Sequence, residues 1–252
     1  MEIIDNLDKK VEIKYPNPNI SDYCNTTFGK LHCINKPILS ILGTSSKQGK
    51  FSLQLQLRKK FIEMGYTIGQ LGTEPSSLLL GFDKVFPMGY GSNLQANSYD
   101  SVYLINHMMG QIEKNNPDLI IVGGQSQTLH SSNGNLSFYS MENIELLLAT
   151  SPDGVVLVIN IDDPIDYINR TINFIECIQE TKVLCLICYP INNNNKWTTV
   201  GFRESVFSMD YASKKISKIE SILERKCILI QNDEDISKIT NIIIKFFSND
   251  GD

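Results

Sequence analysis

The hydrophobic positions of this chain alternate between short apolar runs and longer segments whose apolar residues recur at helical spacing. Short runs rich in β-branched residues are typical of strands buried in a parallel sheet. Helical spacing is typical of the helices that cover such a sheet. The repeated order of strand and helix therefore predicts an α/β fold, a three-layer sandwich with a mostly parallel central sheet.

The expected elements follow one another from residue 37 to the C-terminal region. Strands are predicted at residues 37–42, 66–71, 118–122, 154–160, 182–189 and 227–230. Helices are predicted at residues 52–64, 97–115, 141–149, 165–181, 211–225 and 236–247.

Two regions fall outside this alternation. Residues 1–36 show no clear periodicity and are expected to form an N-terminal arm, whereas residues 37–252 are expected to form the α/β domain. Residues 190–202, PINNNNKWTTVGF, are polar and are interpreted as a surface loop. The alternative interpretation is a lid that brings Trp197 or Phe202 to a bound base.

The strongest chemical signal lies between the first strand and the first helix. In this position, backbone N–H groups and a helix N-terminus can wrap an anionic phosphate. Gly43 and Gly49 permit close approach of the backbone, and Lys50 is placed to reach the phosphates. The predicted nucleotide-binding residues are Gly43, Thr44, Ser45, Ser46, Lys47, Gln48, Gly49, Lys50, Phe51 and Ser52.

The spacing of this loop departs from the Walker A pattern at two positions. Thr44 stands where that pattern has its first glycine, with Gly43 one position earlier. Phe51 stands where the pattern has the Ser or Thr that binds Mg²⁺. Ser52 is therefore the predicted metal-binding hydroxyl.

The loop resembles that of dethiobiotin synthetase-like P-loop proteins, in which Gly-Thr and four further residues precede Gly-Lys. It is also similar to a bacterial family of unknown function that shares this loop. Over the whole chain, the segments ILGTSSKQGKFSLQLQLR, GQLGTEPSSLLLGFDKVFPMGYGS and DLIIVGGQSQ resemble clostridial peptide maturation system proteins. These resemblances imply a P-loop (Rossmann-like) fold and a bound nucleotide. They also imply a role in maturing ribosomally made peptides, with a precursor peptide or another maturation enzyme as partner, and a possible homodimer.

One difference from the dethiobiotin synthetase-like proteins concerns the metal. Where those proteins place a Mg²⁺-associated Glu, this chain has Gly123. The acids considered as substitutes are Glu74, Asp83 and Asp162.

Further candidate residues follow other predicted strands, at the edge where open α/β sheets bind ligands. Glu74 follows the second strand, where it would orient water, bind metal or contact a substrate; the alternative is a helix N-terminal residue. Gln125 follows the third strand and would hold a carboxylate or brace the turn. With Lys50, these two complete the predicted catalytic set. Asp162 and Asp163 follow the fourth strand, and the absence of an Asn-Lys-x-Asp motif nearby favours adenine over guanine.

The cysteine pair Cys185 and Cys188 has CxxC spacing but lies in a predicted strand. Residues three apart on a strand point to opposite faces, so these thiols are interpreted as buried apolar groups rather than metal ligands. His130 is interpreted as a loop histidine rather than an acid–base group.

Composition narrows the class of protein. The 252 residues are 42% hydrophobic and 20% charged, with a formal net charge of -5, which argues against nucleic acid as a partner. No apolar run reaches the length of a signal peptide core or a membrane span, so a cytoplasmic protein without membrane contact is expected.

Three functions remain open at this stage. The leading hypothesis is ATP- and Mg²⁺-dependent activation of a carboxylate or similar group during peptide maturation. The second is an acyltransferase whose loop grips the phosphates of coenzyme A, and the third is a non-catalytic protein that binds a peptide or a partner enzyme.

Overall fold

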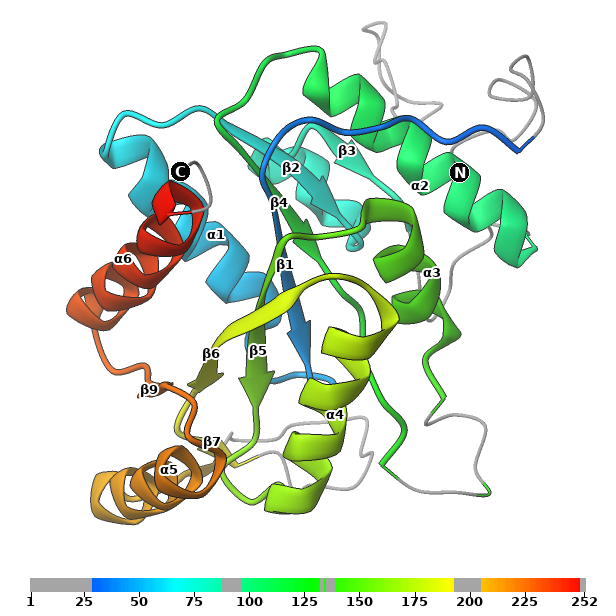
Figure 1. Cartoon of the computed structure of the whole chain (residues 1–252). Coiled ribbons are helices and arrows are strands. Elements are labelled where there is room, and N and C mark those ends of the chain that lie inside the picture. Colours follow the sequence, from blue (N-terminus) through cyan, green and yellow to red (C-terminus); the bar gives the residue numbers. More distant parts are fainter. Residues whose placement is uncertain (1–28, 88–96, 132–133, 135–138, 193–204, 250–252) are drawn as a thin grey trace, which may run out of the picture.

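The computed structural model describes residues 29–87, 97–131, 134, 139–192 and 205–249. Its centre is a seven-stranded parallel sheet in the order β3-β2-β4-β1-β5-β6-β9 (Figure 1). The strands are β1 (Ile38–Gly43), β2 (Ile68–Gly72), β3 (Lys84–Val85), β4 (Leu119–Gly123), β5 (Gly154–Ile159), β6 (Lys182–Cys188) and β9 (Cys227–Leu229). This arrangement confirms the predicted α/β class and the parallel sheet.

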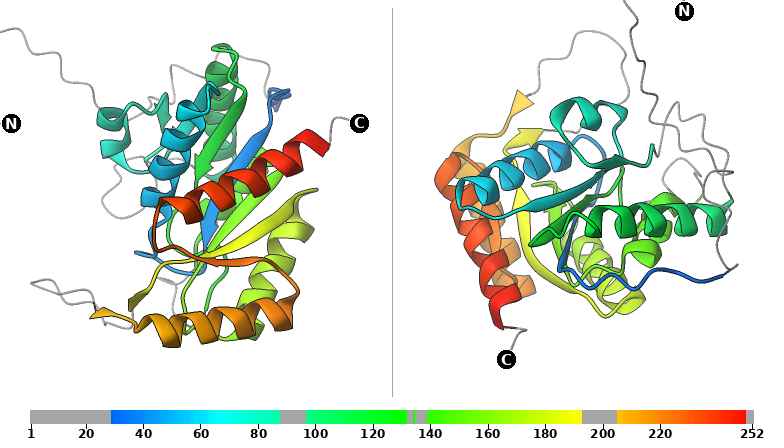
Figure 2. Two further views of the ribbon diagram at one scale, coloured as in Figure 1. Left: turned by 90° about the vertical axis from the view of Figure 1, so that its left-hand side faces the viewer. Right: turned by 90° about the horizontal axis from the view of Figure 1, so that it is seen from above.

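Helices cover both faces of the sheet (Figure 2). They are α1 (Lys50–Glu63), α2 (Ser98–Glu113), α3 (Met141–Thr150), α4 (Ile165–Ile178), α5 (Met209–Leu223) and α6 (Asp233–Asn249). Residues of α2, α3, α4 and α5 share one hydrophobic cluster, and residues of α1 and α6 share the other. The three-layer sandwich is thereby confirmed.

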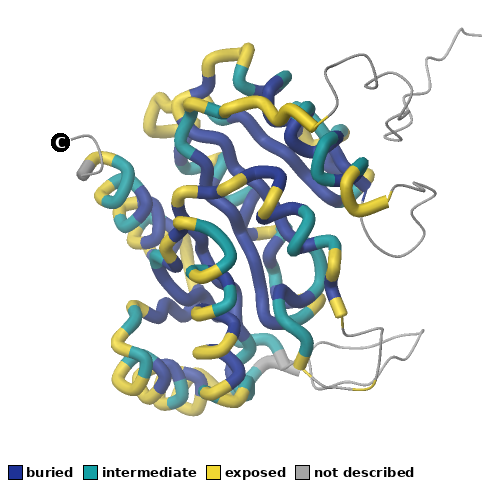
Figure 3. Tube along the Cα trace, turned by 45° about the vertical axis from the view of Figure 1, so that its right-hand side comes forward, coloured by how far each residue is buried: buried dark blue, intermediate teal, exposed yellow. Residues whose placement is uncertain are grey.

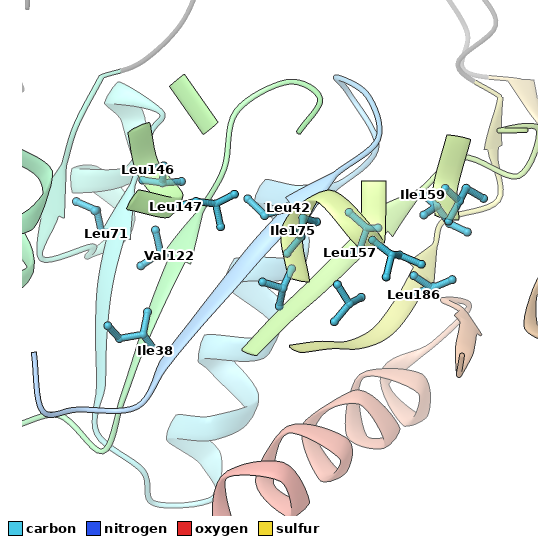
Figure 4. Packing of buried hydrophobic residues seen from close by; sticks show 14 of the residues in the cluster. Ile38, Leu42, Leu71, Val122, Leu146, Leu147, Leu157, Ile159, Ile175 and Leu186 are labelled. Atoms are coloured by element: carbon cyan, nitrogen blue, oxygen red, sulfur yellow. The ribbon is translucent and has the colours of Figure 1, made fainter. Parts of the chain in front are cut away.

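The strands divide their side chains between these two clusters with the expected period of two. In β1, Ile38 and Leu42 join the cluster under α2 and α3, whereas Leu39 and Ile41 join the cluster under α1 (Figure 4). The strands β1 and β5 are buried along their length, and most of the exposed residues lie on the outer surfaces of helices and in loops (Figure 3).

Cys185 and Cys188 follow the same rule. Cys185 lies in the cluster under α1 and α6, and Cys188 lies in the opposite one. Burial raises the pKa of the Cys185 thiol to about 12 and also raises that of Cys188. The prediction that the two thiols face opposite sides of the sheet is confirmed.

Several short elements add to the predicted strands and helices. A 3-10 helix, η2 (Pro75–Leu80), follows β2 with Glu74 as its N-cap residue, which agrees with the alternative interpretation of Glu74, and it leads into the edge strand β3. Beyond β6, β7 (Ile191–Asn192) pairs antiparallel with β8 (Ser205–Val206). Trp197 and Phe202, named above for a lid, lie outside the described residues.

The described part of the N-terminal arm lies along α2. The backbone N–H of His32 donates to Asn106 Oδ1 at 2.6 Å, and Asn106 Nδ2 donates back to the His32 carbonyl at 3.1 Å. The N–H of Asn35 donates to Glu113 Oε1 at 2.6 Å. The division at residue 36 stays a prediction.

Candidate functional site

The loop after β1 turns directly into α1. Gly49 is the N-cap residue of α1 and has a left-handed backbone, with φ 89°, and Lys47 is also left-handed, with φ 55°. The first hydrogen bond inside the helix runs from Leu53 N to Gly49 O at 2.9 Å. The N–H groups of Lys50, Phe51 and Ser52 therefore precede the helical ladder and, together with the helix dipole, form a site suited to an anion.

The side chain of Lys50 folds back across the end of β1. Its Nζ donates to the Ser45 carbonyl at 2.6 Å. A Cβ atom added to Gly43 would stand 2.9 Å from Lys50 Cδ and 3.2 Å from Nζ, so only glycine leaves room for the lysine. Burial lowers the pKa of Lys50 to about 8, and the nearby Glu74 carboxylate partly opposes that effect.

The loop is braced from behind by polar side chains. Gln48 Nε2 donates to Thr44 Oγ1 at 2.8 Å, and Gln48 Oε1 accepts from Ser45 N at 2.9 Å. The Thr44 hydroxyl donates to Asp163 Oδ2, which also accepts from Asn160 N at 2.8 Å. Burial raises the pKa of Asp163, while these hydrogen bonds favour its charged form.

Two tyrosines complete this support. The Tyr167 hydroxyl lies 2.7 Å from the carbonyl oxygens of both Thr44 and Leu129. The Tyr189 ring packs on Gly49, since a Cβ there would stand 2.7 Å from two ring carbons. The Tyr189 hydroxyl donates to Gln56 Oε1 on α1 at 2.7 Å, and burial raises its pKa.

A pocket of about 640 Å³ opens in front of the loop. The residues that line it come from the loop, from α1, and from the segments after β2, β4 and β6. They are Ser46, Lys47, Gln48, Gly49, Lys50, Phe51, Ser52, Gln54, Thr73, Glu74, Gly124, Gln125, Ser126 and Ile191. Gly43, Thr44 and Ser45, which were also predicted to bind the nucleotide, are not among these lining residues.

The predicted catalytic residues meet at this pocket. Lys50, Glu74 and Gln125 all line it, although they follow three different strands. Glu74 is the N-cap residue of η2 and makes no capping hydrogen bond with its side chain. Gln125 Oε1 accepts from the Thr73 hydroxyl at 3.3 Å, and its backbone N–H donates to Asn143 Oδ1 at 2.9 Å.

This geometry agrees with the comparisons to known proteins. A family model described as "Domain of unknown function (DUF1611_C) P-loop domain" matches residues 26–235. The chain belongs to the DUF1611 family. The resemblance to a P-loop family of unknown function is thereby confirmed, and no curated protein matches the chain.

Solved structures show the same fold as this DUF1611 chain. A DUF1611 family protein from Anabaena variabilis superposes with a TM-score of 0.61 at 14% identity, covering 86% of this chain and 62% of that protein. The chain thus spans less than two thirds of that relative's length. A nucleotide-binding protein from Archaeoglobus fulgidus, in complex with ADP, superposes with a TM-score of 0.52 at 14% identity, covering 81% of this chain and 85% of that one.

The two departures from the Walker A pattern have structural counterparts. Phe51 turns toward Phe82, with ring centroids 5.8 Å apart, while Ser52 is exposed and lines the pocket. At the end of β4, Gly123 lies against the Gln54 side chain, which fills the space that a carboxylate at position 123 would need.

The oxygen donors around the pocket fit a hard cation such as Mg²⁺, which prefers oxygen ligands and keeps several waters. Ser52 and Glu74 are the hydroxyl and carboxylate that would hold it. Across the described ranges, no group of three or more His, Cys, Asp or Glu side chains could hold a metal by itself. A cation here would therefore depend on ligand phosphates.

The other candidate acids serve structural contacts. Asp83 Oδ2 accepts from Gln70 N at 2.8 Å beside the edge strand. Asp162 Oδ1 accepts from the Tyr211 hydroxyl at 2.6 Å and lies 3.5 Å from Lys215 Nζ. His130 stacks on Tyr139, with ring centroids 4.6 Å apart. None of these side chains is among the described residues that line the pocket.

The sequence did not reveal the roles of Asp163 and Gln54. The sequence places Asp163 only after the fourth strand, whereas in the structure its carboxylate holds the loop through the Thr44 hydroxyl. Gln54 gave no signal because it reads as one polar residue of an amphipathic helix.

No helix in the described part of the chain is long and apolar enough to cross a bilayer.

Proposed function

We propose that this chain binds ATP, with its phosphates in the loop formed by residues 43–52, and uses it to activate a carboxylate or similar group. The observation that carries the proposal is that the buried Lys50 ammonium group belongs to the first residue of α1 and that Lys50 lines a pocket of about 640 Å³. The ADP complex of the Archaeoglobus fulgidus protein, which shares the fold, supports a nucleotide as the ligand.

Electrostatics favour an anion at this position. Lys50 is only 8% exposed, and this burial removes water from the ammonium group and lowers its pKa to about 8. A phosphate next to Nζ would add negative charge to that of the Glu74 carboxylate and raise the pKa of Lys50 again. The three N–H groups at the start of α1 would add hydrogen bonds to the same anion.

The reaction proposed is attack of a carboxylate oxygen on the γ-phosphorus of ATP. The bond between the γ-phosphorus and the β–γ bridging oxygen breaks, ADP leaves with the electron pair, and an acyl phosphate forms. Lys50 and the loop amides would stabilise charge on the transferring group. Glu74 and Gln125, which also line the pocket, would orient the acceptor, and Mg²⁺ would neutralise phosphate charge when bound.

The biological setting proposed is the maturation of ribosomally made peptides. Its support is the resemblance of three segments of the sequence to clostridial peptide maturation system proteins. A precursor peptide or another maturation enzyme would then be the partner. A homodimer, as in the dethiobiotin synthetase-like proteins, would place a second subunit beside the pocket.

Calorimetric titration with ATP, GTP and acetyl-CoA, each with Mg²⁺ or with EDTA, tests the proposal. We expect micromolar binding of ATP that is lost in Lys50→Met and kept in Lys59→Met, an exposed lysine of the same helix. Preferred binding of acetyl-CoA would replace the ATP proposal with an acyltransferase. No binding of any of the three would reject the loop as a nucleotide site and favour a partner-binding protein.

A further inference from the structure

Gln54 lies directly below the phosphate loop. It is one helical turn after Lys50 on α1, so the two side chains share a helix face. It is 2% exposed and yet lines the pocket, together with Ser52, Glu74 and Gln125. A long polar side chain is therefore held inside the protein at the wall of the candidate site.

The position of its amide is fixed by the end of β4. A Cβ atom added to Gly123 would stand 2.1 Å from Gln54 Nε2 and 2.4 Å from Gln54 Oε1. Only glycine at position 123 is compatible with this placement. The amide thus lies between α1 and the carboxyl end of β4, the strand that leads into Gln125.

One atom of this amide is without a partner. Gln54 Oε1 is buried and accepts no hydrogen bond within the described residues. An unpaired buried acceptor costs free energy, and such groups are rare unless a water, ion or ligand completes them. Because Gln54 lines the pocket, a molecule that fills the pocket can supply the missing donor.

We propose that Gln54 Oε1 accepts a hydrogen bond from a water in the hydration shell of a divalent cation that enters with the phosphates. The inference rests on the proposed nucleotide site and deepens it. Glu74 is the one carboxylate among the described residues that line the pocket, so a cation would keep most of its waters. Those waters donate hydrogen bonds, and the surrounding protein groups, Ser52, Gln125 and Gln54, offer oxygen acceptors.

This arrangement makes Gln54 a positioning residue that sets the metal dependence of ligand binding. A neutral amide holds hydrated Mg²⁺ less strongly than a carboxylate does, because it contributes no charge. The Mg²⁺ effect on nucleotide affinity should accordingly be modest in the natural protein and should change with the chemistry of residue 54.

The test is titration of the full chain with ADP in Mg²⁺ and in EDTA, reported as the ratio of the two affinities. In Gln54→Met, which keeps the length of the side chain, the Mg²⁺ enhancement should fall to about one, since loss of such outer contacts weakens metal binding about tenfold or more. In Gln54→Glu the enhancement should exceed that of the natural protein. The control Gln111→Met changes a half-buried glutamine on α2 that pairs with His107 and should keep the natural ratio.

Each outcome is informative. An unchanged Mg²⁺ enhancement in Gln54→Met, or no gain in Gln54→Glu, would overturn the role of Gln54 while leaving nucleotide binding intact. If Gln54→Met does not fold, the Mg²⁺ enhancement measured for Gln54→Glu decides whether the proposed role of Gln54 stands. Failure of the natural protein to bind ADP in either buffer would instead reject the nucleotide site itself, and this inference with it.

Discussion

Replacing Lys50 by methionine should stabilise the unliganded protein while removing its ligand site. The pKa of Lys50 falls from 10.5 to about 8 on folding because the ammonium is buried. At about 1.4 kcal/mol per pKa unit, holding the charge inside the folded protein costs about 3 kcal/mol at neutral pH. Methionine fills similar space without a charge but loses the hydrogen bond to the Ser45 carbonyl, which is worth about 1 kcal/mol net.

The expected gain in unfolding free energy is therefore about 2 kcal/mol at pH 7, or a rise in Tm of about 4–8 °C for a domain of this size. Because folding lowers the pKa of Lys50, the stability difference between the natural protein and Lys50→Met should also depend on pH. Below pH 8 the folded and unfolded forms are both protonated and the full penalty is present. Between about pH 8 and 10.5 the folded form releases its proton first, so the penalty shrinks as pH rises.

The assay is thermal or urea unfolding of the natural protein, Lys50→Met and Lys59→Met at several pH values without ligand. Lys59 is exposed and pairs with Glu63 at 3.8 Å, so its replacement should change stability little. The reasoning would be refuted by a Lys50→Met protein that is no more stable at pH 7, or by a difference that stays constant up to pH 10.5.

Three further substitutions probe the support of the loop. Asp163→Ala leaves the Thr44 hydroxyl without its acceptor and should lower unfolding free energy by about 2 kcal/mol and weaken ATP binding, as urea unfolding and calorimetry would show. Gly49→Ala places a methyl group 2.7 Å from the Tyr189 ring on a left-handed backbone and should cost about 2 kcal/mol or more; a neutral effect on Tm would contradict this close packing. Gly123→Ala displaces the Gln54 amide, so adding Gln54→Ala to this variant should recover stability. A double-mutant cycle of the two substitutions should give a coupling free energy of about 1 kcal/mol or more. Additive changes in unfolding free energy would mean that the two residues do not touch.

Much of the fold could be read from the sequence because its signals are local. The runs at 154–160 and 182–189 are apolar on both faces, and both became central strands of the parallel sheet. The edge strand β3 was missed because Lys84–Val85 is too short to show a period, and its pairing with β2 depends on tertiary contacts. The same holds for β7 and β8, which are two residues each and are separated by residues 193–204.

The residues of the candidate site differ in the same way: local sequence signals predict the positions of some, whereas others depend on tertiary contacts. The common position of Lys50, Glu74 and Gln125 at one pocket could be predicted because each follows a strand at the ligand-binding edge, and topology alone brings such positions together. Gln54 and Asp163 could not be found, since their roles come from contacts with Gly123 and Thr44 on other elements. A sequence without its fold gives no reason to separate them from ordinary helix and loop residues.

The packing of Tyr189 on Gly49 has a consequence for the thermodynamics of binding. The loop is held in its curved form by side chains from the segments that follow β6 and β5, not by its own residues alone. The loss of backbone entropy that a phosphate-binding loop requires is thus largely complete when the chain has folded. Ligand binding should therefore proceed with little further ordering of the loop, with hydrogen-bond enthalpy as its main driving force.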